Sequence, residues 1–258
     1  MNDTWPSYRN HHLPAFTLRA IRAIPKKSRV VVVLTTGAIE QHGPHLPVGV
    51  DALLGQAYLD RAIPLASQSC PVYTMPPIQV AKSNEHSGYP GTLILHRENL
   101  RQQILASGRQ VADWGFGKLA ILNTHGGNTS VIKSCLRELR PALDARLLAF
   151  PYECECPPRE TRYGIHAGEL ETSLMLALTP DLVRAEASDC CWIGPSDDSS
   201  GLQPECSPAT YAWQTSDLSP TGTMGDATRA TEEKGHLWIE RASQAIADAI
   251  LEFSQSPA

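Results

Sequence analysis

The stretch of residues 30–54 constrains this chain more than any other. It opens with a run of valines and then places Glu40, His42, His45 and Asp51 in a loop broken by glycine and proline. An apolar run without alternation is typical of a strand that is covered on both faces. Acid and imidazole side chains that follow such a strand are typical of sites at strand ends in α/β proteins. The stretch therefore predicts a buried strand at 30–34 that leads into a functional site.

Strands and helices alternate along the rest of the chain. The pattern predicts further strands at 72–75, 118–122 and 147–150, and helices at 18–24, 99–114, 129–139, 169–178 and 232–253. This alternation favours an α/β fold with three layers, α/β/α, and a mostly parallel central sheet. Because no repeat or linker is visible, we expect a single domain over 1–258, with an N-terminal arm at 1–25 and an irregular insertion near the site at 185–220.

Composition and charge exclude several classes of protein. The 258 residues suit one large α/β domain, or at most two small ones. The net charge is −5 without a basic block, which gives nucleic-acid binding no electrostatic support. No apolar run approaches the roughly 18–20 residues of a membrane span, and the first residues lack the features of a signal peptide. We therefore expect a cytoplasmic protein that binds neither nucleic acid nor membrane.

Carboxylate and imidazole side chains follow two of the predicted strands. Residues two apart in an extended loop project to the same side, so Glu40 and His42 can reach a common region. Asp51 precedes a run with helical spacing, where we expect it to be the N-cap and its two oxygens could bridge two cations. His125 follows the strand at 118–122 in a glycine-containing loop. Such ligands suit Zn, Mn or Fe(II).

The helix predicted at 169–178 adds two carboxylates. Leu174 and Leu178 of its apolar face lie three and seven positions after Glu171, which places Glu171 on the buried side. A buried carboxylate needs a cation or strong donors. Glu169 lies toward the mouth of the helix. The alternative for both glutamates is that they only complement the helix dipole in the first turn, and each candidate ligand taken singly could be a cap or a turn residue.

Several motifs occur in order between about residues 30 and 235. They are Gly37-Ala38-Ile39-Glu40-Gln41-His42-Gly43-Pro44-His45-Leu46-Pro47 with Asp51, His86 with Pro90-Gly91-Thr92, Asn123-Thr124-His125-Gly126-Gly127-Asn128, His166-Ala167-Gly168 with Glu171-Thr172-Ser173, and Gly225-Asp226. Together they resemble the creatininase (creatinine amidohydrolase) family. The resemblance implies an α/β/α fold, a centre of two divalent metal ions, hydrolysis of C–N bonds in cyclic or small amides, and often a hexamer.

The resemblance also implies roles for individual residues. Glu40 is implied as a ligand of one metal ion and His42 as a ligand of the other. Asp51 is implied as the bridge between them, with His125 joining the ion of Glu40. His166 is implied as a catalytic or substrate-orienting histidine.

The site has further candidates for contact with the substrate. His86 stands beside Glu85 and before a glycine- and proline-containing turn, so it could line the pocket. We expect His86, Tyr89 and His45 to bind the substrate.

Two departures from the family pattern bear on the substrate. Gly127 stands where creatinine-hydrolysing members have a glutamate, so the His42 ion needs another carboxylate, either Glu171 or Glu169. The tryptophan-bearing segment before the His-Ala-Gly motif is replaced by residues 162–165. We therefore expect a substrate other than creatinine. The family also acts on formamide-type pyrimidine intermediates and on substrates of peptide maturation.

The expected activity is metal-assisted hydrolysis of a small or cyclic amide. A hydroxide between two divalent ions (Zn, Mn or Fe) attacks the carbonyl carbon. His166 stabilises the oxyanion, and His166 or Glu169 protonates the leaving nitrogen. The alternatives are a formamide hydrolase (deformylase) of a cofactor or nucleotide pathway, and a non-enzymatic metal-binding protein. A homo-oligomer is expected, and the resemblance favours a hexamer.

Overall fold

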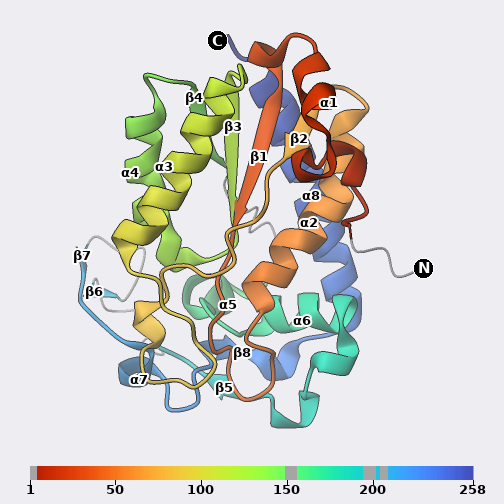
Figure 1. Ribbon diagram of the computed structural model, residues 1–258. Helices are drawn as coiled ribbons and strands as arrows, with labels where there is room; N and C mark the ends of the chain where they lie inside the picture. The colour runs from red at the N-terminus through yellow and green to blue at the C-terminus, as the bar shows by residue number, and fades with distance from the viewer. Residues whose placement is uncertain (1–4, 149–155, 194–201, 204–208, 258) are drawn as a thin grey trace.

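A parallel sheet forms the centre of the protein. The computed structural model describes residues 5–148, 156–193, 202–203 and 209–257. Four parallel strands lie in the order β2-β1-β3-β4 (Figure 1). Their bounds are β1 Val31–Thr36, β2 Val72–Thr74, β3 Lys118–Asn123 and β4 Asp144–Leu148.

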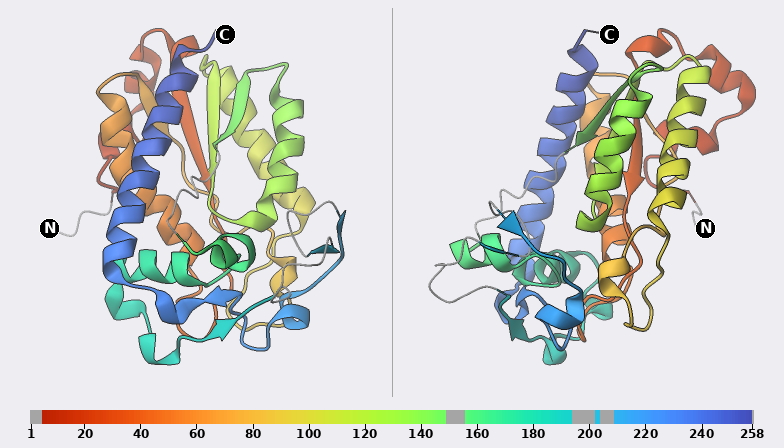
Figure 2. Two further views of the ribbon diagram at one scale, coloured as in Figure 1. Left: turned by 180° about the vertical axis from the view of Figure 1, so that it is seen from behind. Right: turned by 90° about the vertical axis from the view of Figure 1, so that its left-hand side faces the viewer.

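Helices cover both faces of this sheet, which confirms the predicted three-layer α/β/α fold. Two of them, α2 (Val50–Ser67) and α8 (Glu232–Gln255), cover one face. The opposite face carries α3 (Arg97–Asp113) and α4 (Thr129–Leu139), as the two views of Figure 2 show. Helix α6 (Glu169–Leu178) packs on α2 and α8 beyond the carboxyl ends of the strands.

Shorter elements complete the described chain. The helices are α1 Leu18–Ala23, α5 Pro158–Tyr163 and α7 Thr215–Leu218, and the strands are β5 Cys190–Cys191, β6 Leu202–Gln203, β7 Ala209–Thr210 and β8 Gly225–Asp226. Single 3₁₀ turns occur at Arg9–His11, Leu13–Ala15, Lys27–Arg29, Asn84–His86, Gly126–Asn128, Pro180–Leu182, Ala185–Ala187 and Ala227–Arg229. In the described part of the chain, no helix has both the length and the apolar character that a membrane crossing requires.

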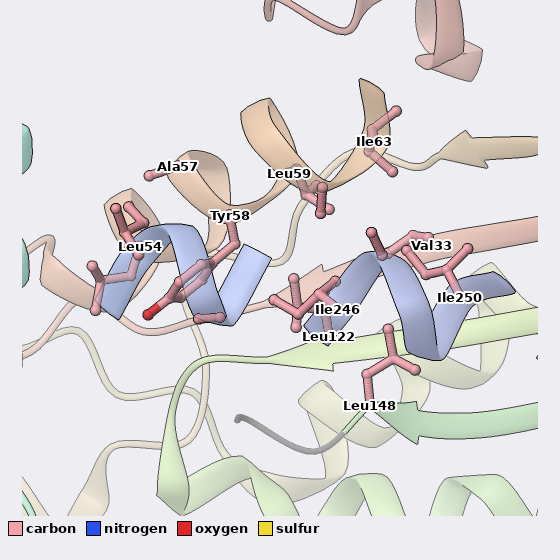
Figure 3. Close-up of a cluster of buried hydrophobic side chains, with 14 of the residues drawn as sticks. Val33, Leu54, Ala57, Tyr58, Leu59, Ile63, Leu122, Leu148, Ile246 and Ile250 are labelled. Carbon is pink, nitrogen blue, oxygen red and sulfur yellow. The ribbon is translucent and has the colours of Figure 1, made fainter. Parts of the chain in front are cut away.

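The unbroken apolar run of β1 feeds two separate cores. Val31 and Val33 face α2 and α8, whereas Val32 and Leu34 face α3 and α4. Figure 3 shows the first core, where Val33 of the sheet lies near side chains of α2 and α8. Because alternate residues of one strand are buried on opposite faces, both layers of helices depend on the same short segment.

Two expectations from the sequence are wrong in detail. Asp51 is not the N-cap of α2, because the helix begins at Val50, after Gly49, and no side chain caps it. Asp51 lies inside the first turn, and its carboxylate is directed at His42 and His125 instead. The last strand of the sheet begins at Asp144, three residues before the predicted start, and residues 149 and 150 lie outside the described part.

The organisation as a single domain over 1–258, with an N-terminal arm at 1–25 and an insertion at 185–220, stays a prediction. The described part of the arm packs on β2, where the His12 Nδ1 lies 2.8 Å from the Thr74 Oγ1. The predicted insertion at 185–220 includes residues 194–201 and 204–208, which lie outside the described residues.

Candidate active site

Neighbouring strand ends bring the candidate ligands together. The last residues of β1 and β3, Thr36 and Asn123, are paired in the sheet. Gly37 then allows close packing, because a Cβ there would lie 3.0 Å from the backbone carbon of Asp51. The Thr124 hydroxyl also donates a hydrogen bond of 2.8 Å to the Asp51 carbonyl oxygen. The start of α2 is thus held against the ends of both strands.

One group of possible ligands consists of Glu40, Asp51 and His125. The His125 Nδ1 lies 3.2 Å from the Glu40 Oε1 and 3.3 Å from the Asp51 Oδ2. All three residues are buried. Their donor atoms converge at the carboxyl ends of β1 and β3.

A second group consists of His42, His166 and Glu171. The His42 Nε2 lies 3.7 Å from the Glu171 Oε2 and 3.4 Å from the Asp51 Oδ1. Asp51 therefore directs one carboxylate oxygen at each group. The rings of His42 and His166 lie close together, with centroids 4.2 Å apart.

Backbone carbonyl groups fix which ring nitrogens carry hydrogen. The His42 Nδ1 donates to the Glu40 carbonyl oxygen over 3.0 Å, and the His125 Nε2 donates to the Lys82 carbonyl oxygen over 2.7 Å. In both neutral rings the other nitrogen is therefore bare and faces carboxylates. Within the described residues, the Glu40 Oε2, the His42 Nε2 and the Asp51 Oδ2 have no hydrogen-bond partner.

The spacing of these atoms suits a divalent cation. Around a tetrahedral ion with bonds of about 2.1 Å, ligand atoms stand about 3.4 Å apart, close to the separations between His125, Asp51 and His42. Bare imidazole nitrogen and carboxylate oxygen are the donors that Zn, Mn and Fe(II) accept. The residues present therefore fit metal ions at both groups.

The pKa values of His42 and Asp51 also favour a site for positive charge. Burial lowers the pKa of His42, but the carboxylates of Asp51, Glu171 and Glu40 outweigh burial and raise that pKa to about 10. Burial raises the pKa of Asp51, but His42 and His125 outweigh burial and lower it to about 2. These carboxylates thus require positive charge beside them, which protons or metal ions can supply.

The loop before α6 prepares Glu171 for this role. Ala167 has a left-handed backbone, with φ of 53°, which costs a residue with a Cβ roughly 1–2 kcal/mol. In this conformation the Ala167 N–H donates a 2.6 Å hydrogen bond to the Glu171 Oε2. Burial and the nearby Asp51 carboxylate raise the pKa of Glu171 to about 7, although His42 opposes them.

A cavity of about 1180 Å³ opens onto the two groups. Glu40, His125, His166 and Glu171 form the part of its lining that belongs to the groups. The remaining wall includes the loop at 82–86, the start of α4, helix α5 and the chain just before α7. The charged and aromatic side chains of this wall include Glu85, Lys133, Glu160, Arg162, Tyr211 and Trp213.

Five of the ten predicted site residues line this cavity: Glu40, His86, His125, His166 and Glu171. His42 and Asp51 are buried and are not among the described residues that line it. His86 lies on its wall, whereas His45 and Tyr89 are absent from the described residues that line it. The His45 Nε2 instead lies 2.8 Å from the Thr172 hydroxyl, and the Tyr89 hydroxyl donates to the Ser219 carbonyl oxygen.

Glu169 is also not brought to the cavity. Its buried carboxylate is directed at the first turn of α8, where it lies 2.6 Å from the Lys234 Nζ. Of the two carboxylates that the sequence proposed for the His42 group, only Glu171 faces that group.

Three residues at the site were not assigned roles from the sequence. The Gln41 amide contacts the rings of His86 and His166. The Glu85 Oε1 lies 3.4 Å from the His125 Nε2, and Glu160 accepts hydrogen bonds from two backbone N–H groups. Glu85 adjoins His86 in the sequence, which was a usable signal; the other two depend on partners far along the chain.

The fold and the site define an α/β protein with buried histidine–carboxylate groups at the carboxyl edge of its sheet. A family model described as "Creatininase: Creatinine amidohydrolase" matches residues 15–250. The chain therefore belongs to the creatininase family, as its motifs indicated.

Individual relatives agree with this assignment. A creatinine amidohydrolase from Pseudomonas putida is 32% identical over 246 residues, covering 86% of this chain and 89% of the relative. A mycofactocin precursor peptide peptidase from Mycobacterium ulcerans is 31% identical over 210 residues, covering 79% and 78%. A crystal structure of creatinine amidohydrolase (creatininase) matches with a TM-score of 0.77 and 27% identity, covering 96% of this chain and 99% of that one. These relatives are hydrolases, with different substrates in their names.

Proposed function

We propose that the protein is a metal-dependent amidohydrolase that cleaves a C–N bond of a cyclic or small amide. The observation that carries this proposal is the pair of ligand groups that share Asp51 at the base of a cavity, with bare ring nitrogens opposite carboxylates. The family and the creatinine amidohydrolase from Pseudomonas putida support the same reaction type.

The ligand roles follow from the two groups. Glu40, Asp51 and His125 would hold one divalent ion, and His42, Asp51 and Glu171 would hold the other. Two such ions (Zn, Mn or Fe) would polarise the substrate carbonyl and lower the pKa of a bound water. The Ala167 N–H and the backbone carbonyl groups behind the rings keep these ligands oriented.

His166 is the residue that we assign to proton transfer. Its Nε2 lies 2.7 Å from the Gln41 carbonyl oxygen, so its Nδ1 is bare and lies 3.6 Å from the Glu40 Oε1. Burial lowers the pKa of His166 well below its ordinary value, and the neighbouring His42 and His86 lower it further. A neutral ring at the cavity wall can take a proton from the attacking water and return it to the leaving nitrogen. Glu169, bound to Lys234, has no part in this assignment.

A peptide substrate is the second candidate. The cavity, at about 1180 Å³, is larger than the roughly 300–1,000 Å³ that is usual for small-molecule pockets. Its wall carries Lys133, Arg162 and Trp213, which offer charge and an aromatic face to a longer chain. The name of the relative from Mycobacterium ulcerans agrees with such a substrate.

Metal analysis and substrate assays test the proposal. We expect two divalent ions per chain, and hydrolysis by the metal-replete protein of at least one member of a panel of lactams, formamides and short peptides. Asp51→Asn should lower activity by at least about 100-fold and release metal. Asp60→Asn, on the same helix, is the matched control and should retain both. Unchanged metal content in Asp51→Asn, or no hydrolysis of any amide, would refute the assignment.

A further inference from the structure

Gln41 stands between Glu40 and His42 in the sequence and is buried. Its side-chain amide has a fixed orientation. The Oε1 accepts a 2.9 Å hydrogen bond from the Gly43 N–H, and the Nε2 donates over 3.2 Å to the Gly222 carbonyl oxygen. Because the oxygen faces a donor and the nitrogen faces an acceptor, a flipped amide would lose both bonds. One N–H of the Nε2 remains for the neighbouring histidines.

Two ring nitrogens lie within reach of that N–H. The His86 Nδ1 is 2.8 Å away and the His166 Nε2 is 3.0 Å away. The His166 Nε2 also lies 2.7 Å from the Gln41 backbone carbonyl oxygen, which can only accept. His166 therefore carries its hydrogen on Nε2 and cannot accept another, so the amide N–H goes to the His86 Nδ1.

In this assignment His86 differs from the other three histidines because its protonated nitrogen, and not its bare one, faces a carboxylate. Its Nδ1 accepts, so its hydrogen is on Nε2, 3.4 Å from the Glu40 Oε1. In their neutral forms, His42, His125 and His166 instead present bare nitrogens to carboxylates. The separation alone does not distinguish His86 from a ligand, but the position of its hydrogen does.

Building on the proposed function, we propose that Gln41 is a positioning residue that fixes His86 as a hydrogen-bond donor to Glu40. His86 then lies outside the ligand set. Glu40, His86 and His166 form a third group whose donor atoms could hold a cation. A cation there would need a bare nitrogen on His86, whereas the N–H of His86 faces the Glu40 Oε1. Donors behind a ligating carboxylate orient it toward its ion. Metal ions are thereby directed to the two groups that share Asp51.

A second polar neighbour of His86 does not decide its tautomer. The buried Thr215 hydroxyl lies 2.9 Å from the same Nδ1. A hydroxyl group can donate or accept, so it is compatible with either tautomer. The Gln41 amide nitrogen can only donate, and it therefore determines which atom of His86 carries the hydrogen.

The tautomer can be measured directly by ¹⁵N NMR of the histidine rings in the metal-free protein. We expect His86, identified by the loss of its signals in His86→Gln, to have an unprotonated Nδ1 and a protonated Nε2. Thr215→Val should leave this pattern unchanged. Gln41→Glu replaces the donor with an acceptor and should place hydrogen on Nδ1. Hydrogen on the Nδ1 of the wild-type ring, or a pattern that follows Thr215 and not Gln41, would overturn the proposal.

Metal stoichiometry gives an independent measurement. His86→Gln should still bind as many ions as the wild type, with affinity weakened by about 10–100-fold, as expected of a residue outside the ligand set. The loss of one whole ion in this variant would show that His86 is a ligand and would contradict the inference. Failure of the wild type to bind any metal would refute the proposed function, whereas the ring tautomer would still be read from the metal-free protein.

Discussion

Gly127 is the residue whose small size the site uses most directly. A Cβ there would lie 2.0 Å from the Glu85 Oε1 and 2.5 Å from the His125 Nε2. The space beside His125 is therefore filled by the carboxylate of Glu85, which reaches it from another loop. Glu85 thus stands beside His125, whereas the carboxylate that faces the His42 group comes from Glu171.

We expect Gly127→Ala to weaken metal binding by about 10–100-fold, because Glu85 and His125 must move to make room. Gly126→Ala is the neighbouring control, since a Cβ at that position meets nothing within 4 Å. Competition titrations with a metal-binding dye would compare the two variants. Equal affinities would show that the contact at position 127 does not matter to His125.

Protons and metal ions compete for the same ring nitrogens. The surrounding carboxylates raise the pKa of His42 to about 10 and that of His125 well above its ordinary value in the metal-free protein. Metal affinity should therefore increase as pH rises from about 6 to 9, and binding should release protons. Calorimetry in buffers of different ionisation enthalpy measures this release. An affinity that does not change with pH would contradict the raised pKa values of His42 and His125.

Three of the candidate ligands could be predicted because they follow a recognisable element. Glu40 and His42 come after a buried strand, and His125 comes after another, so parallel strands predicted their convergence. The contacts of Gln41 could not be predicted in this way, since its partner Gly222 lies 181 positions away. No local pattern reports which distant carbonyl group will face an amide.

Among the elements, α5 holds the loop of His166 through one side chain. The Glu160 carboxylate accepts a 2.6 Å hydrogen bond from the Glu169 N–H and a 2.9 Å hydrogen bond from the Asp226 N–H. These donors belong to the first turn of α6 and to β8. Glu160 thus ties three short elements together beside the cavity.

Glu160→Ala should destabilise the protein by about 2–4 kcal/mol, because two N–H groups lose their acceptor at a buried position. Glu186→Ala, in an exposed turn, should change stability by less than about 0.5 kcal/mol. Urea unfolding of both variants gives the comparison. A Glu160 variant as stable as the wild type would show that other acceptors replace the carboxylate.

The boundaries of elements were less predictable than their order. The strand β1 was expected one residue earlier than it begins, and α8 two residues shorter than it is. The larger error at β4 arises because its first residues are only half-buried and lack an apolar run. Asp51 is of a residue type that often caps helices, which led to its prediction as the N-cap. Its carboxylate is instead directed at His42 and His125, which only the folded chain brings near.

For the whole molecule, an exposed apolar surface bears on the expected self-association. Val48, Val80, Leu93 and Ile94 are at least partly exposed, with 37%, 38%, 49% and 47% of their surfaces accessible. Their loops are connected by the backbone. The Glu40 N–H donates to the Val48 carbonyl oxygen, and the Leu93 N–H donates to the carbonyl oxygen of the adjacent Ile39. Ala81, which follows Val80, pairs with Ile94. Apolar groups gathered in this way are typical of interaction sites.

We expect the protein to form a homo-oligomer, with a hexamer favoured by the family resemblance. Light scattering after gel filtration should give a mass that is a multiple of that of one chain. The double variant Leu93→Ser with Ile94→Ser should shift the mass downward, whereas Leu237→Ser, an exposed leucine of α8, is the control. A monomeric wild type at micromolar concentration would contradict the expectation.

The proposed ligands and part of the cavity wall come from different segments of the chain, which affects how the range of substrates can change. The proposed ligands are positioned by strand ends and by hydrogen bonds to the backbone, whereas Lys133, Arg162, Tyr211 and Trp213 come from segments that supply none of them. We expect exchange of these four residues to leave the proposed ligand groups in place and to change what fits beside them. A library restricted to these positions would search substrate range at constant chemistry.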